Sequence, residues 1–476
     1  MRVLIRADAS PTIGSGHIAR CLTLARVLRE QGSHVAFACR RLPGHRLDVL
    51  SEEGFETFAL PDFYPDEDPQ QAIESMLPWQ ADIDALGALL QGHGEFDWII
   101  VDHYGLDHHW QTAARRWAPH IAAVDDLATR RYSIDLLLNQ NLSGLSENYA
   151  ALVPDGCRTL LGPRYAMLRE EFNGPAIEIK ARARRVLVNF GGFDAAMQTH
   201  HAMLALVGFP ELEVDFVAGA DNPAWAQMQA LSDTRPNWRL HSFVSDFHQR
   251  MTEADLFIGA GGGTSWERAA LGLPTICIAV SNNQQVNGEV MAAAGAHIFM
   301  GAREQISVEQ LRDAIGFVAG NQYLRQSLAE RSRQLVDGRG ALRVAAALAG
   351  AVLKVRPATQ DDTPLLLDGM RASLRNPQHL LLIAEADDGP VGVLRYDLRG
   401  FEADVSLHLF AGRIDLGWGR ALLARGESFV RAHWPQLTAI SAQVQPDNHA
   451  SLNVFRDAGF NQNACAFTKV LKEHHT

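Results

Sequence analysis

The chain has 476 residues, too many for one ordinary hydrophobic core, so its length predicts about two to four domains. Its formal net charge of -12 argues against a nucleic-acid binder, which would need a basic face. The 5 cysteines lie far apart without a Cys-x-x-Cys pair, which argues against a disulfide framework or a zinc site. The sequence shows neither an apolar run of about 18 residues nor a signal-peptide pattern, so we expect a cytoplasmic protein without membrane contact.

The first part of the chain alternates short apolar runs with amphipathic stretches, such as residues 18–28, which carry apolar side chains at helical spacing. This alternation predicts parallel β-α-β units with right-handed crossovers. We therefore expect a Rossmann-like lobe over residues 1–175. The runs typical of its buried strands are residues 3–5, 35–38, 98–101 and 121–124.

The same alternation restarts near Arg185 and predicts a second Rossmann-like lobe over residues 176–350. The last part, residues 351–476, has a hairpin pattern around Gly389-Pro390 and predicts an α+β domain instead. The fold class is therefore α/β for the two lobes, with an α+β domain after them. Ligands of parallel sheets bind beyond the carboxyl ends of the strands, so the loops there are the candidate sites.

The loop between the first strand and the first helix contains Gly14, Gly16 and His17. Its glycines allow close backbone approach, the helix N-terminus attracts an anion, and the imidazole can activate water. The structural alternative is a tight turn with His17 as a helix cap. The loop also fits the dinucleotide pattern Gly-x-Gly-x-x-Ala, but the second strand ends in Arg40-Arg41 instead of the acidic residue that NAD requires. NAD is therefore disfavoured, and NADP stays open.

The second lobe carries two glycine-rich turns, each between a strand and a helix. Consecutive glycines expose backbone amides that can hold a diphosphate, and Glu267 can accept hydrogen bonds from ribose hydroxyls. The structural alternative is helix capping by Thr264 and Asp194. The turns comprise Gly191, Gly192, Phe193 and Asp194 in the first, and residues 259–268 with Gly262, Gly263, Thr264 and Ser265 in the second.

Four motifs occur in a fixed order along residues 1–345. They are Gly14-x-Gly16-His17-x-x-Arg20-Cys21-Leu22, Val101-Asp102-His103-Tyr104-Gly105, Gly162-Pro163-Arg164-Tyr165-Ala166-x-Leu168-Arg169-x-x-Phe172 and Gly262-Gly263-Thr264-Ser265-Trp266-Glu267. Together they resemble the UDP-2,4-diacetamido-2,4,6-trideoxy-β-L-altropyranose hydrolases of pseudaminic acid synthesis. That family is related in fold to the two-domain glycosyltransferases, so the resemblance implies a GT-B-type arrangement of the lobes.

The resemblance implies metal-free release of UDP by attack of water on the anomeric carbon. His17 matches the family's proposed general base, and Tyr104 matches a tyrosine implicated in the site. UDP is a good leaving group, so the protein has to position the water, take its proton and hold the diphosphate. The residues expected to bind the UDP-activated amino sugar are Gly14, Gly16, Arg20, Gly191, Gly192, Gly262, Gly263, Thr264, Ser265, Glu267 and Asn283.

Several other polar residues follow strands or lie in loops. His103 either orients the sugar or caps the strand end through a backbone hydrogen bond, and we favour the second role. Asp125-Asp126 ends a strand and could form a metal site, but a solvated loop or a helix cap is favoured. His108-His109 and His474-His475 have no partner at metal-ligand spacing and are expected at the surface. We therefore expect no metal site.

A second resemblance covers about residues 353–472. The loop Gly417-Trp418-Gly419-Arg420-Ala421-Leu422-Leu423 opens a helix, and Val444-x-Pro446-x-Asn448-x-x-Ser451-x-x-x-Phe455-x-x-x-Gly459-Phe460 follows. Together they resemble the GNAT family of N-acetyltransferases, whose cosubstrate is acetyl-CoA, with its pyrophosphate on the helix N-terminus. The residues that the resemblance assigns to acetyl-CoA are Leu409, Leu416, Gly417, Trp418, Gly419, Arg420 and Asn448.

This domain departs from that family at two positions. Ile414 stands where Gln or Arg is usual, and Phe455 stands where many members have a tyrosine as general acid, so the general acid is unassigned. A domain that only binds CoA is the alternative. Asp404 and His408 are candidate bases for the amine, and the alternative for His408 is an ordinary strand histidine.

The two resemblances imply consecutive steps of one pathway. There, a 4-amino sugar on UDP is N-acetylated just before UDP is removed, and other enzymes of the pathway are candidate partners. Two other functions stay open: a glycosyltransferase that uses a UDP-sugar, and a non-catalytic sugar-nucleotide sensor in which His17 only donates a hydrogen bond. Release of UDP without any acceptor separates the hydrolase from both.

Overall fold

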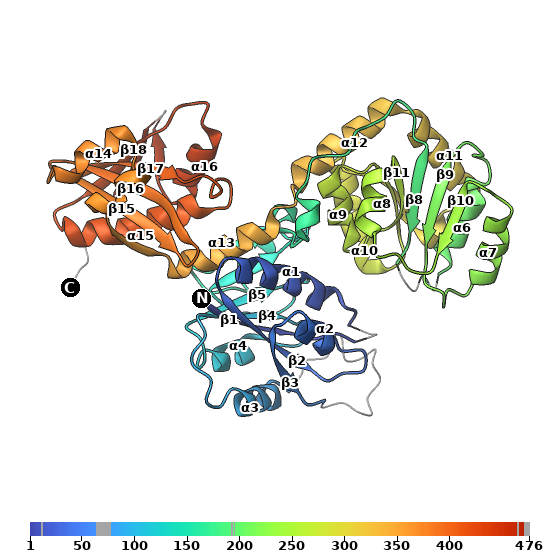
Figure 1. Ribbon diagram of the computed structural model, residues 1–476, viewed down its shortest axis with the longest axis horizontal. Helices are drawn as coiled ribbons and strands as arrows, with labels where there is room; N and C mark the ends of the chain where they lie inside the picture. The colour runs from blue at the N-terminus through green and yellow to red at the C-terminus, as the bar shows by residue number, and fades with distance from the viewer. Residues whose placement is uncertain (11–12, 63–77, 192–193, 195, 464–465, 471–476) are drawn as a thin grey trace.

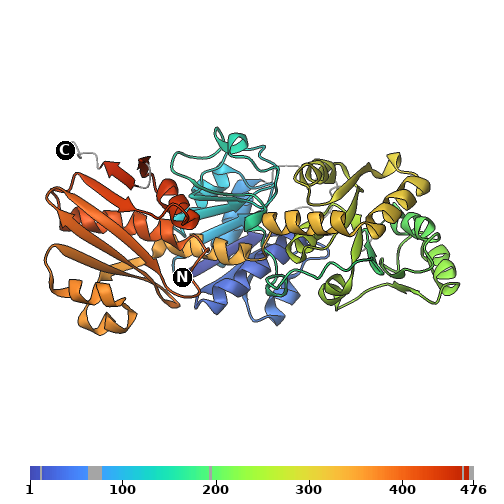
Figure 2. The same ribbon diagram turned by 90° about the horizontal axis from the view of Figure 1, so that it is seen from above.

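The computed structural model describes residues 1–10, 13–62, 78–191, 194, 196–463 and 466–470 (Figure 1). The described residues form three sheets of 7, 6 and 7 strands, each with its own helices. Figures 1 and 2 show three bodies side by side, with the first lobe between the second lobe and the last domain. No helix in the described part of the chain combines the length and apolarity needed to span a bilayer.

The first lobe is a parallel sheet of order β3-β2-β1-β4-β5-β6-β7. Its central strands are nearly continuous buried apolar runs, as expected for a sheet covered on both faces. The strands are β1 (Arg2–Ala7), β2 (His34–Arg40), β3 (Glu56–Leu60), β4 (Trp98–Asp102), β5 (His120–Val124), β6 (Leu136–Asn139) and β7 (Arg158–Leu161). The helices are α1 (Gly16–Glu30), α2 (Leu47–Glu52), α3 (Trp79–Leu89), α4 (His108–Ala114) and α5 (Ser146–Tyr149).

The second lobe is a parallel sheet of order β10-β9-β8-β11-β12-β13. Two short 3-10 helices, η1 (Pro163–Tyr165) and η2 (Glu170–Phe172), lie in the segment that leads to it. The strands are β8 (Arg185–Asn189), β9 (Glu213–Val217), β10 (Trp238–His241), β11 (Leu256–Ala260), β12 (Thr275–Ala279) and β13 (Ile298–Ala302). The helices are α6 (Gln198–Leu206), α7 (Trp225–Asp233), α8 (Phe247–Glu253), α9 (Thr264–Leu271), α10 (Asn282–Ala293), η3 (Arg303–Gln305), α11 (Val308–Gly320) and α12 (Gln322–Leu335).

The last domain is a mixed sheet of order β14-β15-β16-β17-β18-β20-β19. Among its described strands only β17 and β18 run parallel, and they pair over residues 402–404 and 439–441. The strands are β14 (Lys354–Pro357), β15 (His379–Ala386), β16 (Gly389–Arg399), β17 (Glu402–Leu409), β18 (Ala439–Gln443), β19 (Asn461–Asn463) and β20 (Ala466–Val470). The helices are η4 (Gln360–Leu365), α14 (Asp368–Arg371), η5 (Ala372–Arg375), α15 (Trp418–His433) and α16 (His449–Asp457). Two parallel sheets and one mixed sheet confirm the predicted Rossmann-like lobes and α+β domain.

Helix α13 (Gly340–Val352) joins the first lobe to the last domain (Figure 1). One side of this alanine-rich helix, including Val344 and Leu348, belongs to the core of the first lobe. The other side, including Ala346 and Ala349, belongs to the core of the last domain. The helix follows α12 in sequence, and the expected boundary at residue 350 falls inside it.

Candidate functional site

His17 lies in the first turn of α1, directly beyond the carboxyl end of β1, and its side chain is buried. Its Nδ1 is 2.5 Å from Oδ1 of Asp102, the last residue of β4. The two meet because β4 pairs with β1 in the sheet, with Asp102 in register with Ala7. The hydrogen bond to the carboxylate places the proton on Nδ1 and leaves Nε2 as the basic nitrogen.

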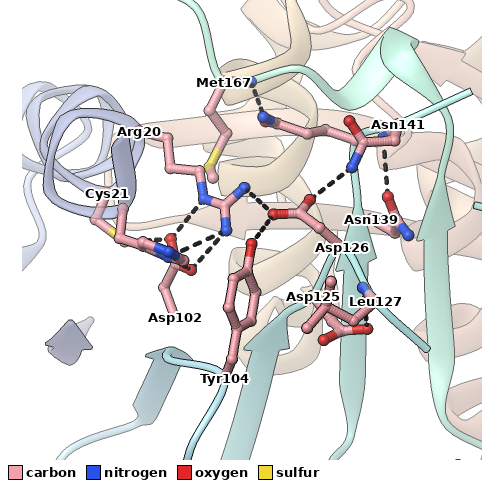
Figure 3. Close-up of polar contacts among 12 residues, drawn as sticks. Arg20, Cys21, Asp102, Tyr104, Asp125, Asp126, Leu127, Asn139, Asn141 and Met167 are labelled. Atoms are coloured by element: carbon pink, nitrogen blue, oxygen red, sulfur yellow. Dashed lines mark hydrogen bonds and ion pairs between the residues drawn. The ribbon is translucent and has the colours of Figure 1, made fainter. Parts of the chain in front are cut away.

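Arg20 links two carboxylates, those of Asp102 and Asp126 (Figure 3). Its guanidinium donates to both oxygens of Asp102, at 2.6 and 2.7 Å, and to Asp126 at 2.8 Å. Tyr104 donates its hydroxyl to the same Asp126, and its ring meets the His17 imidazole edge-on at 4.8 Å between centroids. The carboxyl ends of β1, β4 and β5 thus supply one connected polar network.

Burial and charge act in opposite directions on this network. Burial tends to raise the pKa of Asp102, but Arg20 and His17 outweigh it and hold that pKa well below the ordinary value. Burial raises the pKa of the Tyr104 phenol, and Asp126 raises it further. Asp102 is therefore an anion and Tyr104 a hydrogen-bond donor throughout the physiological range.

The neighbouring polar residues have structural partners. His103 is buried, with Nε2 3.3 Å from Asp8 and with Nδ1 accepting the amide N–H of Gly105 at 2.9 Å. Asp125 accepts the amide of Leu127 (Figure 3) and the amide of Ala128, and so holds the turn after β5. This geometry favours the strand-end role of His103 over contact with a sugar.

His108 and His109 lie at the start of α4, where Asp107 caps the helix through the amide of His109. The pair was expected to have no partner at metal-ligand spacing, but ligand atoms of Asp107, His108 and His109 lie within 4.8 Å of one another. His474 and His475 lie outside the described residues.

In the second lobe, the turn between β11 and α9 exposes backbone amides. Gly263 precedes α9 without a side-chain cap, so Thr264 does not fill the capping role considered above. Buried Arg268 donates to the carbonyl of Ala260 at 3.0 Å and thereby braces the turn from behind. Gln284 accepts the amide of Gly261 from the other side, at 3.2 Å.

Glu267 lies in the first turn of α9 with 19% of its side chain exposed. Burial raises its pKa, and Arg169, whose guanidinium lies 3.6 Å away, only partly offsets this effect. In the other turn Gly191 has a φ of 101° and Asp194 caps α6 through the amides of Gln198 and Thr199. Gly192, Phe193 and the side chain of Asn283 lie outside the described part of the chain.

In the last domain β17 continues beyond the residues that pair with β18, and α15 begins after the loop that follows β17. Gly417 precedes α15 with a φ of 86°, and no side chain caps the helix. Gly419 is held between β17 and α16, since a Cβ atom there would lie 2.9 Å from Val454 and 3.2 Å from Leu407. Leu416 and Trp418 are buried and anchor the loop, which leaves the amides of the first turn for an anion.

Two of the residues discussed for the acetyl-CoA site, Asn448 and Phe455, have structural roles. Asn448 caps α16 by accepting the amide of Ser451 at 3.0 Å. Phe455 is a buried member of an aromatic cluster with Phe460 and Phe467. Its ring fills the core, so no acid can act from this position.

The two candidate bases of this domain differ in their partners. Asp404 forms an ion pair with Arg399 at 2.9 Å and accepts the hydroxyl of Ser441 where β17 and β18 still pair. His408 lies farther along β17, where β18 has separated, and its ring contacts Phe410. These positions favour His408 as the base.

Asp102 and Asp126 are the residues that sequence reasoning did not assign to the first site. Both follow strands whose existence the sequence predicts, and both end next to His17 or Tyr104. The signal was available, because polar residues at the carboxyl ends of adjacent parallel strands converge. The sequence does not show the order of the strands in the sheet, and that order decides which strand ends are neighbours.

Two Rossmann-like lobes with glycine-rich turns at the carboxyl ends of parallel strands, followed by a mixed sheet with two diverging strands, define a GT-B-type protein joined to a GNAT-type domain. Residues 190–335 match the Glycosyltransferase family 28 C-terminal domain, and residues 352–460 match the Acetyltransferase (GNAT) family. Both predicted resemblances are thus confirmed at the level of domains.

Relatives of known name cover the two lobes. The UDP-2,4-diacetamido-2,4,6-trideoxy-beta-L-altropyranose hydrolase of Campylobacter jejuni is 26% identical over 300 residues, which are 63% of this chain and 98% of the relative. The spore coat polysaccharide biosynthesis protein SpsG of Bacillus subtilis is 27% identical over 201 residues, 41% of this chain and 59% of the relative. The predicted similarity to the hydrolases is therefore confirmed.

Solved structures share the GT-B fold at low identity. MurG of Acinetobacter baumannii aligns with a TM-score of 0.52 at 15% identity, over 73% of this chain and 99% of that protein. The kitacinnamycin glycosyltransferase aligns with a TM-score of 0.55 at 16% identity, over 73% of this chain and 98% of that protein. These likenesses confirm the predicted GT-B-type arrangement of the lobes.

Proposed function

We propose that the two lobes hydrolyse a UDP-activated amino sugar to UDP and free sugar, with UDP-2,4-diacetamido-2,4,6-trideoxy-β-L-altropyranose as the substrate. The observation that carries this proposal is the His17–Asp102 pair at the N-terminus of α1, with Tyr104 against the imidazole. The similarity to the Campylobacter jejuni hydrolase over 98% of its length supports the choice of substrate.

His17 acts as the general base. With its proton on Nδ1 and held by Asp102, its Nε2 takes a proton from a water that attacks the anomeric carbon. Asp102 then stabilises the imidazolium that forms, and Arg20 fixes the position of that carboxylate. Tyr104 stays protonated and donates a hydrogen bond, which assigns it to positioning instead of proton transfer.

The second lobe holds the leaving group. The uncapped amides after Gly262 and Gly263 and the positive end of α9 stabilise the charge that develops on the diphosphate. Glu267 accepts hydrogen bonds from the ribose, and Thr264 and Ser265 complete the turn. Gly14, Gly16 and Arg20 line the sugar side in the first lobe, and Gly191, Gly192 and Asn283 the nucleotide side. No step requires a metal.

The test of the hydrolase is His17→Asn. We expect the variant to bind UDP with unchanged affinity and to lose about 100- to 10,000-fold in turnover, because proton removal supplies a factor of that order. The exposed His109, changed to Asn, serves as the matched control and should keep full activity. Near-normal turnover in His17→Asn removes His17 from the mechanism.

We further propose that the last domain transfers an acetyl group from acetyl-CoA to the 4-amino group of the UDP-sugar that precedes the hydrolase substrate. The match to the GNAT family and the uncapped start of α15 support acetyl-CoA as cosubstrate, with the residues from Leu416 to Arg420 at its pyrophosphate. Leu409 and Asn448 lie along its acyl arm. His408 takes the proton of the attacking amine.

Mass spectrometry of products from the UDP-4-amino sugar, with and without acetyl-CoA, tests both reactions at once. The proposal expects N-acetylated free sugar and UDP only when acetyl-CoA is present. Acetylated UDP-sugar without UDP release would contradict the hydrolase alone, and UDP release without acetylation would contradict the assigned acceptor alone.

A glycosyltransferase is the second candidate, favoured by the match of residues 190–335 to the Glycosyltransferase family 28 C-terminal domain. It predicts that release of UDP from the acetylated UDP-sugar depends on an added carbohydrate acceptor. UDP and free sugar formed in buffer alone exclude this function.

A further inference from the structure

Arg158 of the first lobe lies against the loop that opens α15 in the last domain. It is the first residue of β7, and its side chain passes α13. A Cβ atom on Gly417 would lie 3.6 Å from Nη2 of Arg158, and one on Gly350 would lie 3.8 Å from its Nη1. The guanidinium therefore lies within contact distance of both α13 and the loop that opens α15.

The positive charge of the Arg158 guanidinium is not balanced by a neighbouring carboxylate in the part of the chain that the structure describes. Its Nε is buried without a hydrogen-bond partner, and its Nη1 donates a long hydrogen bond of 3.4 Å to the carbonyl of Ala347. Among the described residues no carboxylate forms an ion pair with it, whereas Arg420 of α15 is near enough to act on its charge. Burial lowers the pKa of Arg158, and Arg420 lowers it further. Two cations next to an uncapped helix N-terminus favour an anion between them.

The loop itself is held in shape by α13 and the residue before it. Arg339 donates to the carbonyl of Ile414 at 3.2 Å, and buried Arg343 donates to the carbonyl of Asp415 at 3.1 Å. Asp415 has a φ of 62° and Gly417 one of 86°, so the backbone turns sharply here. Since these carbonyls are bound from the α13 side, the amides that follow them remain free for a ligand.

We propose that Arg158 binds the diphosphate of acetyl-CoA, so that the acetyl-CoA site is shared between the first lobe and the last domain. This inference rests on the proposed use of acetyl-CoA by that domain. A guanidinium forms two parallel hydrogen bonds to phosphate oxygens, and the exposed Gly417 and Arg420 leave the loop open to solvent. The first lobe thereby contributes a binding residue to the reaction of another domain.

Isothermal titration calorimetry on the full chain tests the proposal with acetyl-CoA, 3′-dephospho-acetyl-CoA and acetyl-pantetheine, which lacks all phosphates. Arg158→Met should weaken binding of the first two by about 10- to 100-fold, the effect of losing a hydrogen bond to a charged group. Arg158→Lys should fall between Arg158→Met and wild type, because it keeps the charge without the fork. The exposed Arg131, changed to Met, is the matched control in the same lobe and should bind as wild type does.

The pattern across the three ligands decides the outcome. An equal loss for acetyl-pantetheine in Arg158→Met means that Arg158 only supports the fold of the loop, and it overturns the proposal. A loss confined to acetyl-CoA moves Arg158 to the 3′-phosphate and overturns the diphosphate assignment. Equal affinity of wild type and Arg158→Met overturns the inference alone, whereas a wild type that binds no acetyl-CoA overturns the proposed acetyltransferase with it.

Discussion

Replacing Asp102 with asparagine removes a negative charge beside His17 while it keeps the shape of the side chain. Asp102 accepts from Nδ1 of His17 at 2.5 Å and from Arg20 at 2.6 and 2.7 Å. An asparagine can instead offer its own N–H to Nδ1, which selects the tautomer whose Nε2 already carries a proton. His17 would then point a donor, not a base, at the water.

The loss of charge has a second effect on the same step. Nδ1 of His17 lies 3.3 Å from Nη2 of Arg20, so two cations are neighbours once His17 has taken a proton. Two unit charges at that separation repel by up to about 5 kcal/mol at an effective dielectric constant of about 20, and Asp102 is the group that offsets this repulsion. Since general-base catalysis contributes about 100- to 10,000-fold, we expect kcat of Asp102→Asn to fall by a factor in that range.

A coupled assay of UDP release measures this fall, and calorimetry with UDP checks that the second lobe still binds nucleotide. Because Arg20 and His17 hold the pKa of Asp102 well below its ordinary value, the carboxylate stays ionised at every pH of the assay, and the wild-type profile should contain no step from it. Asp135→Asn, at a half-exposed aspartate away from His17, is the control. Turnover of Asp102→Asn within about threefold of wild type would refute the role of the pair, since a lost general base costs at least about 100-fold.

Three further changes probe the other parts of the molecule. Glu267→Gln should weaken UDP binding by about 10-fold. In wild type, UDP affinity should fall as the pH is lowered, starting above the ordinary glutamate pKa of 4.5, because burial raises the pKa of Glu267 and protonation removes the acceptor. Calorimetry across pH measures this fall, and a pH-independent affinity would contradict the ribose contact. Gly417→Ala forces a non-glycine residue to a φ of 86° and should lower the free energy of unfolding by about 1–2 kcal/mol in denaturant titrations, with no loss if the loop relaxes. Arg343→Met removes hydrogen bonds to the carbonyls of Arg164 and Asp415 and should lower the free energy of unfolding by about 2–3 kcal/mol. A change under about 0.5 kcal/mol would show that these hydrogen bonds do not stabilise the contact between the first lobe and the last domain.

Local sequence motifs predicted those features of the candidate sites that depend on a single continuous segment. Gly417 and Gly263 stand before helices, and the structure leaves both helix starts uncapped. His17 follows a strand and a glycine-rich loop, so its place at the carboxyl end of β1 also follows from the chain order. These features depend on backbone conformation within about ten residues, which glycine and helix-start patterns report directly.

The partners of these segments depend on strand order, which no local pattern encodes. Asp102 is 85 positions from His17, and the two meet only because β4, not β5, lies next to β1. Asp126 was expected in a solvated loop or a cap for the same reason, yet it accepts from Arg20 and Tyr104. Ion pairs between the ends of strands that are distant in sequence could therefore not be predicted from the sequence and are seen only in the structure.

Helix α13 shows how one alanine-rich segment can join two domains into one body. Small side chains let it approach both neighbours: a Cβ atom on Gly340 would lie 2.1 Å from the carbonyl of Ala166, and one on Gly350 would lie 2.9 Å from Ala421. Trp98 of the first lobe donates to the carbonyl of Leu348 at 3.1 Å. Because the helix belongs to both cores, displacing the last domain from the first lobe would expose apolar surface on each, at about 25 cal/mol per Å². The first lobe and the last domain should thus move as a unit, so the proposed UDP-sugar site would open by motion of the second lobe.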